Sequence, residues 1–247
     1  MELAFSREND GQRNSLYELI CTSAQAYDAY LGKLGLEPNR DIAWLKREMS
    51  AMTLADLVDL EARFSWRLAS MAAGFPAVAN EVLAGRKSFS RQAEIQSFKW
   101  ALKKADLDLA DPDFCDYFEE DDIIEVYSEQ GVQLYRSWSC YRHCSYSVLE
   151  LKLYDWDTLY QRPSWVAKTL WEMMPRLFEP GQKTIAYNIP EYVMTERLQK
   201  HNRRLLFRMK YASPLLDKST GRTCAFVSTG HISLLRDASP SPDILIL

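Results

Sequence analysis

The feature that most constrains the fold is a succession of strand-like segments between residues 118 and 236. Alternating β-branched and aromatic residues at 123–127 and 132–135 predict two strands, and Gly131 between them suits the positive-φ position of a tight turn. Three longer strand-like runs close the region: Tyr192–Leu198, Leu205–Leu216 and Cys224–Leu235. We therefore expect a hairpin and three long strands to share one five-stranded antiparallel sheet.

The middle of this region reads as short helices that would cover the sheet. Ser145 or Ser147 can cap a first short helix, and Pro163 suits the start of a later one. The order of strand, turn, strand, aromatic-rich helices and three strands resembles a PAS sensory domain. Cys144–Leu151 resembles the Gly-Tyr-Ser-x-x-Glu-Leu segment of that family, with Ser145 in the place of the glycine. The resemblance covers about half of the chain and implies an α+β sensory module.

Two segments depart from the family pattern. Lys200–Asn202 stands where the family usually has an Asp-Gly turn between two strands, although Asn202 can adopt the same left-handed conformation. Gly230–Ser233 stands where many members end in Asp-Ile-Thr before an output helix. The usual route of signal output is therefore not implied for this chain.

Residues 1–117 read as helical because apolar residues recur at spacings of three and four. Leu16, Ile20 and Ala24 begin one such stripe, and Thr53 has the character of a helix cap. We expect four parts of the chain: a helical domain at 1–87, a connecting helix at 88–117, a PAS-like domain at 118–236 and a flexible tail at 237–247.

The connecting helix carries a stripe long enough for a packing or dimer seam. Its apolar residues alternate at three and four positions over about two heptads. The residues of this possible homodimer seam are Ile95, Phe98, Leu102 and Leu109.

Composition limits the classes of partner and the location. The chain has 47% hydrophobic and 26% charged residues and a formal net charge of −4, which gives no electrostatic footprint for nucleic acid. No run approaches the length of a membrane span, and Met1–Glu8 has no apolar signal region, so we expect a cytoplasmic protein without a membrane anchor. Five cysteines in such a chain favour reduced thiols.

A ligand cavity is predicted between the short helices and the inner face of the sheet, since aromatic side chains gather there and small-molecule sites are largely apolar. The alternative is that these side chains simply fill the core. The residues expected to line the cavity are Trp156, Tyr160, Trp171, Phe207, Met209 and Phe226.

The sequence leaves the cofactor unknown, because it has no haem, flavin or metal signature. Cys140 and Cys144 with His143 between them offer too few ligands for a tetrahedral metal. Residues 165–178 lack the axial histidine that haem-binding members carry, and residues 139–142 lack the asparagine of the reactive-cysteine motif in flavin photoreceptors. Four carboxylates at 119–122 favour a solvated, edge-protecting cluster over a cation site.

Three functional hypotheses follow. The first is a non-catalytic sensory protein that binds a small apolar or aromatic ligand and signals through its N-terminal helices or a dimer interface. The second is an adaptor with a filled core that recruits a partner protein. The third is a small α+β cavity enzyme, for which Asp155 or Asp157 with His231 is the pairing that the sequence offers.

Overall fold

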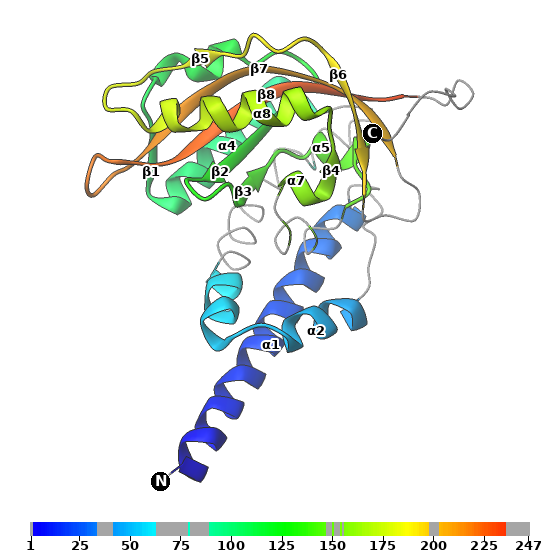
Figure 1. The fold of residues 1–247 in the computed structure, drawn as a ribbon, viewed down its shortest axis with the longest axis vertical. Coiled ribbons are helices and arrows are strands. Elements are labelled where there is room, and N and C mark those ends of the chain that lie inside the picture. The colour runs from blue at the N-terminus through cyan, green and yellow to red at the C-terminus, as the bar shows by residue number, and fades with distance from the viewer. Residues whose placement is uncertain are drawn as a thin grey trace.

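The computed structural model describes most of the chain (Figure 1). The described residues are 2–33, 42–62, 79, 89–146, 150, 154, 156–197 and 203–235. The predicted tail at 237–247 and the segment around Gly85 lie outside them.

The N-terminal residues are helical, as predicted. Helix α1 spans Glu2–Lys33, helix α2 spans Ile42–Ser50, and a further helical stretch covers 54–62. Thr53 and Asp56 form a reciprocal cap, in which Thr53 N donates to Asp56 Oδ2 at 2.8 Å and Asp56 N donates to Thr53 Oγ1 at 3.2 Å. In Figure 1, α1 extends away from the sheet, and α2 lies beside α1.

All five strands that the sequence predicts are present. Strands β2 (Asp122–Ser128) and β3 (Gln133–Arg136) form the hairpin, and Gly131 takes a φ of 77° in its turn. The three long strands are β6 (Tyr192–Glu196), β7 (Arg204–Asp217) and β8 (Thr223–Leu234). The mixed α+β class is therefore confirmed.

The sheet has eight strands in the described residues, so the prediction of five was too low. The additional strands are β1 (Leu107–Leu109), β4 (Tyr160–Gln161) and β5 (Ile185–Ala186), which are too short to produce an alternating pattern. The main order is β3-β2-β8-β7-β6-β4, and every pairing is antiparallel. One edge of β7 pairs with β8, while its other edge pairs in turn with β6, β5 and β1.

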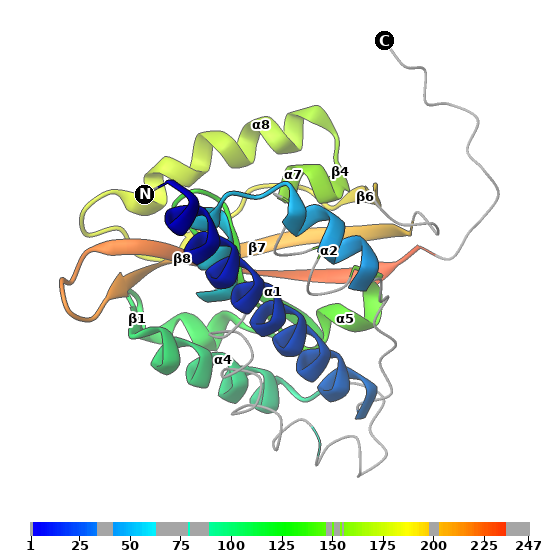
Figure 2. The same cartoon turned by 90° about the horizontal axis from the view of Figure 1, so that it is seen from below.

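Helices cover both faces of this curled sheet. Helix α4 (Arg91–Ala105) and helix α8 (Ser164–Met173) lie on opposite sides of β7 and β8 (Figure 2). The shorter helices are η1 (Pro112–Tyr117), α5 (Cys140–His143), α7 (Trp156–Leu159) and η2 (Met174–Phe178). The sheet thus has two buried faces. On β2, for example, Ile123 and Tyr127 pack in one core, and Ile124 and Val126 pack with α4 in the other.

The predicted connecting helix belongs structurally to the sheet. Residues 88–117 contain α4, β1 and η1, and β1 pairs with β7. Ser90 caps α4 by accepting from Ala93 N at 3.2 Å, and Asp106 ends the helix in the left-handed conformation.

The residues of the predicted dimer seam lie on α4 and β1 and pack within their own chain, which gives no support to a seam there, and dimerisation itself stays a prediction. Phe98 is 0% exposed and Leu102 is 6% exposed, because both pack against the sheet of their own chain. Ile95 and Leu109 are half-buried against the same core. The apolar stripe of α4 is therefore an intramolecular packing face.

Gly230 allows a close approach of neighbouring backbone within the sheet. A Cβ at this position would lie 2.7 Å from the carbonyl oxygen of Arg208 and 3.2 Å from Phe207 Cζ. Because the first contact is with backbone, Gly230→Ala should lower the free energy of unfolding by about 1–3 kcal/mol in urea denaturation. Gly11→Ala is the control: Gly11 lies within α1 with nothing near its missing Cβ, so alanine should raise stability by about 0.5–1 kcal/mol. Equal effects of the two substitutions would contradict the assignment.

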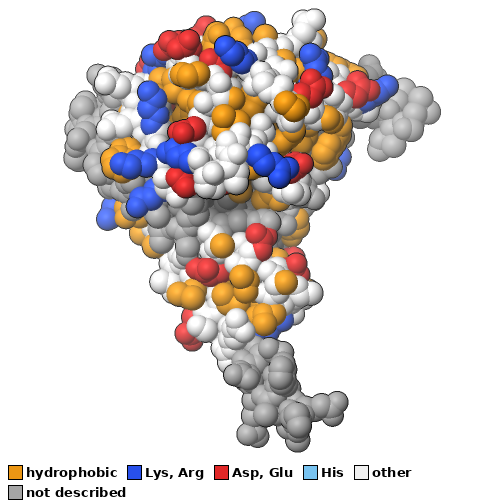
Figure 3. All heavy atoms as spheres, turned by 90° about the vertical axis from the view of Figure 1, so that its left-hand side faces the viewer, with side chains coloured by type: hydrophobic (Ala, Val, Ile, Leu, Met, Phe, Trp, Pro, Cys, Tyr) orange, Lys and Arg blue, Asp and Glu red, His pale blue; other side chains and the backbone are white. Residues whose placement is uncertain are grey.

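The surface around β1 and the β7–β8 turn carries charges of both signs among scattered apolar side chains (Figure 3). An ion pair there joins Lys218 Nζ to Asp108 Oδ1 at 3.5 Å. No helix within the described ranges combines the length and the apolar character needed to cross a bilayer.

Candidate functional site

A cavity lies between the sheet and the covering helices α8 and η2. Its volume is about 50 Å³. Since one buried water needs roughly 10–15 Å³ of such space, the cavity has room for a few waters or for a ligand of a few non-hydrogen atoms. Most of the lining is apolar or aromatic: Ile123, Tyr127, Tyr160, Leu170, Met174, Tyr187, Tyr192, Met194, Phe207, Met209, Phe226 and Ile232. The remaining lining residues are Glu125, Arg136, Cys140, Arg162 and Ser228.

The structure brings four of the six predicted site residues to this cavity. Tyr160 enters from β4, Phe207 and Met209 from β7, and Phe226 from β8. Trp171 does not line the cavity and is 47% exposed, because it lies on the outward face of α8. The side chain of Trp156 lies outside the described residues.

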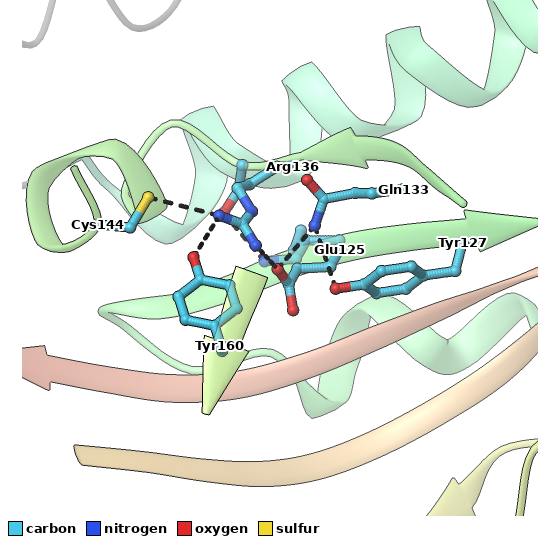
Figure 4. A network of polar contacts seen from close by, with 8 residues as sticks. Glu125, Tyr127, Gln133, Arg136, Cys144 and Tyr160 are labelled. Atoms are coloured by element: carbon cyan, nitrogen blue, oxygen red, sulfur yellow. Dashed lines mark hydrogen bonds and ion pairs between the residues drawn. The ribbon is translucent and has the colours of Figure 1, made fainter. Parts of the chain in front are cut away.

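A buried ion pair contributes polar groups to the cavity lining, and Figure 4 shows the network of polar contacts around it. Glu125 on β2 and Arg136 on β3 are directly opposite in the hairpin register, and Arg136 Nη2 lies 2.6 Å from Glu125 Oε1. The two side chains are 9% and 3% exposed, respectively. The same Glu125 oxygen accepts from Gln133 Nε2 at 3.0 Å, and Gln133 Nε2 also donates to Tyr127 Oη at 3.1 Å. A charge pair buried this deeply is held in place by hydrogen bonds from several elements.

Arg136 links the hairpin to the covering layer. Its Nη1 donates to Tyr160 Oη at 3.0 Å and to Cys144 Sγ at 3.4 Å, as Figure 4 shows. Its Nε is buried and has no hydrogen-bond partner among the described residues. One guanidinium donor at the cavity is therefore still available for an acceptor.

The pKa values of the Cys140 and Cys144 thiols are shifted in opposite directions. Burial raises the pKa of Cys140 well above its usual value. A hydrogen bond from Cys140 lowers the pKa of Cys144 to about 7, with burial opposing the change and the positive charge of Arg136 supporting it. Cys144 therefore gains thiolate character as the pH rises through neutrality.

The phenols around the cavity remain protonated at neutral pH. Burial is the main cause that raises the pKa of Tyr127, and Glu125 adds to it, while the positive charges of Arg136 and Arg162 oppose the rise. Burial also raises the pKa of Tyr192 to about 12, against the charge and hydrogen bond of Arg162. These hydroxyl groups can donate hydrogen bonds to a ligand.

The other chemically suggestive residues lie away from the cavity. Lys210 Nζ contacts Glu119 Oε2 at 2.5 Å and Asp122 Oδ1 at 2.8 Å, so part of the acidic cluster forms ion pairs with β7. His231 Nδ1 lies 3.9 Å from the same Asp122 oxygen and does not line the cavity. Asp155 and the side chain of Asp157, proposed as its catalytic partners, lie outside the described residues. Across the described parts of the chain, no three His, Cys, Asp or Glu side chains come together as metal ligands.

Sequence reasoning missed the polar part of the cavity lining. The sequence pattern places Glu125 in a predicted strand, and the predicted site residues do not include it. Its alternation with Ile123 and Tyr127 puts all three on one face of β2, and a charged residue between two apolar neighbours on a buried face is the signal that could have found it.

A comparison with protein-family models found no match for the chain, and neither did a search of the curated proteins.

Proposed function

We propose that the chain is a non-catalytic, PAS-like sensory or regulatory protein that binds a small apolar or aromatic ligand in this cavity. The observation that carries the proposal is an apolar cavity with a preformed cluster of polar groups in its lining, which is the usual composition of a small-molecule site. The volume of about 50 Å³ favours a ligand of a few non-hydrogen atoms. A larger aromatic ring would require the flexible side chains of Met174, Met194 or Met209 to move.

The order of elements supports the resemblance on which the proposal rests. The hairpin β2–β3, the short helices and the strands β6, β7 and β8 follow one another as expected, and the five strands are neighbours in the sheet. We propose that the covering helices report on the contents of the cavity.

A route for the signal is offered by the core itself. Ile20 of α1 and Leu45 of α2 belong to the same buried cluster as Tyr160, Leu170 and Phe207, which line the cavity. A ligand that repacks this cluster would therefore change the packing of the N-terminal helices. We place the output in these helices, because the seam on α4 is buried in its own chain.

Native mass spectrometry of the chain from its natural host tests the proposal. A small molecule that leaves on denaturation is expected from the unmodified chain. Met209→Trp should abolish it by filling the cavity, whereas Arg208→Trp, on the exposed side of the same strand, should retain it. A bare polypeptide in the unmodified chain, or equal occupancy in both variants, would argue against a ligand at this cavity.

An adaptor function is the second candidate, favoured by two exposed tryptophans on α8. Trp165 is 46% exposed and Trp171 is 47% exposed, although Trp is usually buried in a folded chain. This alternative predicts that the double variant Trp165→Ser/Trp171→Ser loses association with a partner protein while Met209→Trp keeps it. The reverse pattern favours the sensor.

A further inference from the structure

The charged residues that line the cavity have unequal numbers of positive and negative groups. Arg136 and Arg162 contribute two positive charges, and Glu125 contributes one negative charge. Among the described residues that line this cavity of about 50 Å³, positive side chains therefore outnumber negative ones by one. Such an excess near a low-dielectric interior favours a ligand that brings one negative charge.

The two guanidinium groups act on the same part of the cavity. Both Arg136 and Arg162 counteract the rise in the pKa of Tyr127, and Arg162 does so for Tyr192. The phenols of Tyr127 and Tyr192 also line the cavity and stay protonated. The two guanidinium groups also lie close to one ring, because Arg136 Cζ is 5.9 Å and Arg162 Cζ is 5.1 Å from the centroid of Tyr160, which lines the same cavity.

Arg136 has an unused donor for an anionic group. Its side chain is 3% exposed, and its Nε lacks a partner among the described residues. A buried donor without an acceptor costs free energy that a ligand oxygen would recover. Planar carboxylates suit guanidinium donors especially well.

The rest of the cavity determines what is attached to the anion. Phe207, Met209 and Phe226 lie along the sheet side, and Leu170 and Met174 lie along the helical side. An apolar tail of two or three carbons fits both this lining and the small volume. A phosphate dianion fits less well, because the described lining offers no cation beyond the two arginines to balance its second charge against Glu125.

We propose that the ligand of this cavity is a small monocarboxylate, held by Arg136 and Arg162 and with its short apolar tail against the aromatic wall. This inference rests on the proposed function and specifies its ligand class. A ligand of about five non-hydrogen atoms should bind with a Kd on the order of micromolar or weaker.

Calorimetric titration of the full chain with propionate and with propionamide tests the inference. The two probes have nearly the same shape, and only propionate is an anion. The titration is done at pH 6, where the thiol of Cys144 is mainly protonated because its pKa is about 7. Propionate should bind at least about tenfold more tightly than propionamide, since a charged hydrogen-bonded pair exceeds a neutral one by roughly that factor.

Two variants at the cavity should change propionate affinity in opposite directions. Arg162→Gln should weaken binding about tenfold by removing a positive charge, and Glu125→Gln should strengthen it by removing the competing carboxylate. Arg208→Gln, an exposed arginine outside the cavity, is the matched control and should leave the affinity unchanged. If the substitutions acted only by loosening the fold, both Arg162→Gln and Glu125→Gln would weaken propionate binding. Opposite changes in affinity therefore identify an electrostatic role.

The outcomes separate this inference from the function on which it rests. If propionamide binds as well as propionate, or Arg162→Gln has no effect on propionate, the monocarboxylate is excluded while a neutral ligand remains in agreement with the sensor. If neither probe binds and native mass spectrometry finds a bare polypeptide, both the ligand class and the sensory function are overturned.

Discussion

Arg136→Met is expected to lower the free energy of unfolding by about 3–5 kcal/mol, which is the usual cost of removing one partner from a buried ion pair. The cause is the carboxylate of Glu125, whose side chain is only 9% exposed. In the variant, this buried carboxylate would lose the guanidinium that now lies 2.6 Å away. Tyr160 Oη and Cys144 Sγ would lose their donor as well. Urea denaturation monitored by circular dichroism measures the change.

Two controls separate the buried charge from lost packing. The double variant Glu125→Met/Arg136→Met should recover most of the stability, because a buried pair replaced by apolar groups of similar volume is often neutral. Lys168→Met removes one partner of an exposed pair, 3.8 Å apart on α8, and should cost less than about 1 kcal/mol. A double variant as unstable as Arg136→Met would show that packing, and not the unpaired carboxylate, dominates.

The strands were predictable because their residues carry local signals. In β2 and β8, runs rich in β-branched residues end at turn residues, β7 is a long run of leucines and aromatic residues, and Gly131 and Gly221 in the turns both adopt a positive φ. The short strand β1 has no such signal: three residues after α4 become a strand because they pair with the end of β7. Pairing between distant segments is a tertiary property that a local pattern does not contain.

The apolar part of the site was predictable, whereas its polar part was not. Phe207, Met209 and Phe226 follow from strand alternation once the inner face is chosen. Trp171 shows the limit of this reasoning, since an aromatic residue on a covering helix can face outward. The Glu125–Arg136 contact depends on hairpin register, which a bulge between Val126 and Tyr127 shifts by one residue.

The stripe on α4 illustrates how one pattern can indicate two structures. A three–four alternation marks the apolar face of a helix, but it does not specify whether a second chain or a sheet covers that face. Here Phe98 and Leu102 pack against Ile124, Val126 and neighbouring strands. The polar residues Glu94 and Ser97 lie on the same buried face and accept hydrogen bonds from the segment that follows β3. These bonds are a second sign that the face packs within its own chain.

Glu94→Ala should lower the free energy of unfolding by about 3 kcal/mol or more, because several buried donors lose their acceptor at about 1–3 kcal/mol each. Glu94 is 1% exposed and accepts from Trp138 N at 3.0 Å, Ser139 N at 2.6 Å and Ser139 Oγ at 2.7 Å. These bonds tie α4 to the start of α5. Gln96→Ala, at an exposed position of α4, is the control and should change stability by less than about 0.5 kcal/mol.

Glu94 should also make stability depend on pH, in a direction opposite to that of most carboxylates. Burial raises the pKa of Glu94 to about 7 from its ordinary value of 4.5, despite the hydrogen bonds from Ser139 and Trp138. The folded state therefore binds the proton more tightly than the unfolded state does. The stabilisation from this proton is complete below the unfolded pKa, near pH 4.5, and is lost as the pH rises through about 7.

Comparison with Glu94→Gln isolates this contribution from that of every other titrating group. The free energy of unfolding of the natural chain minus that of the variant should fall by about 3 kcal/mol between pH 4.5 and pH 7.5, and then level off. Glutamine carries no charge, so it cannot reproduce the slope. A difference that rises over this range would mean that the donors from Trp138 and Ser139 stabilise the carboxylate more than burial penalises it, and that Glu94 is ionised in the folded protein throughout.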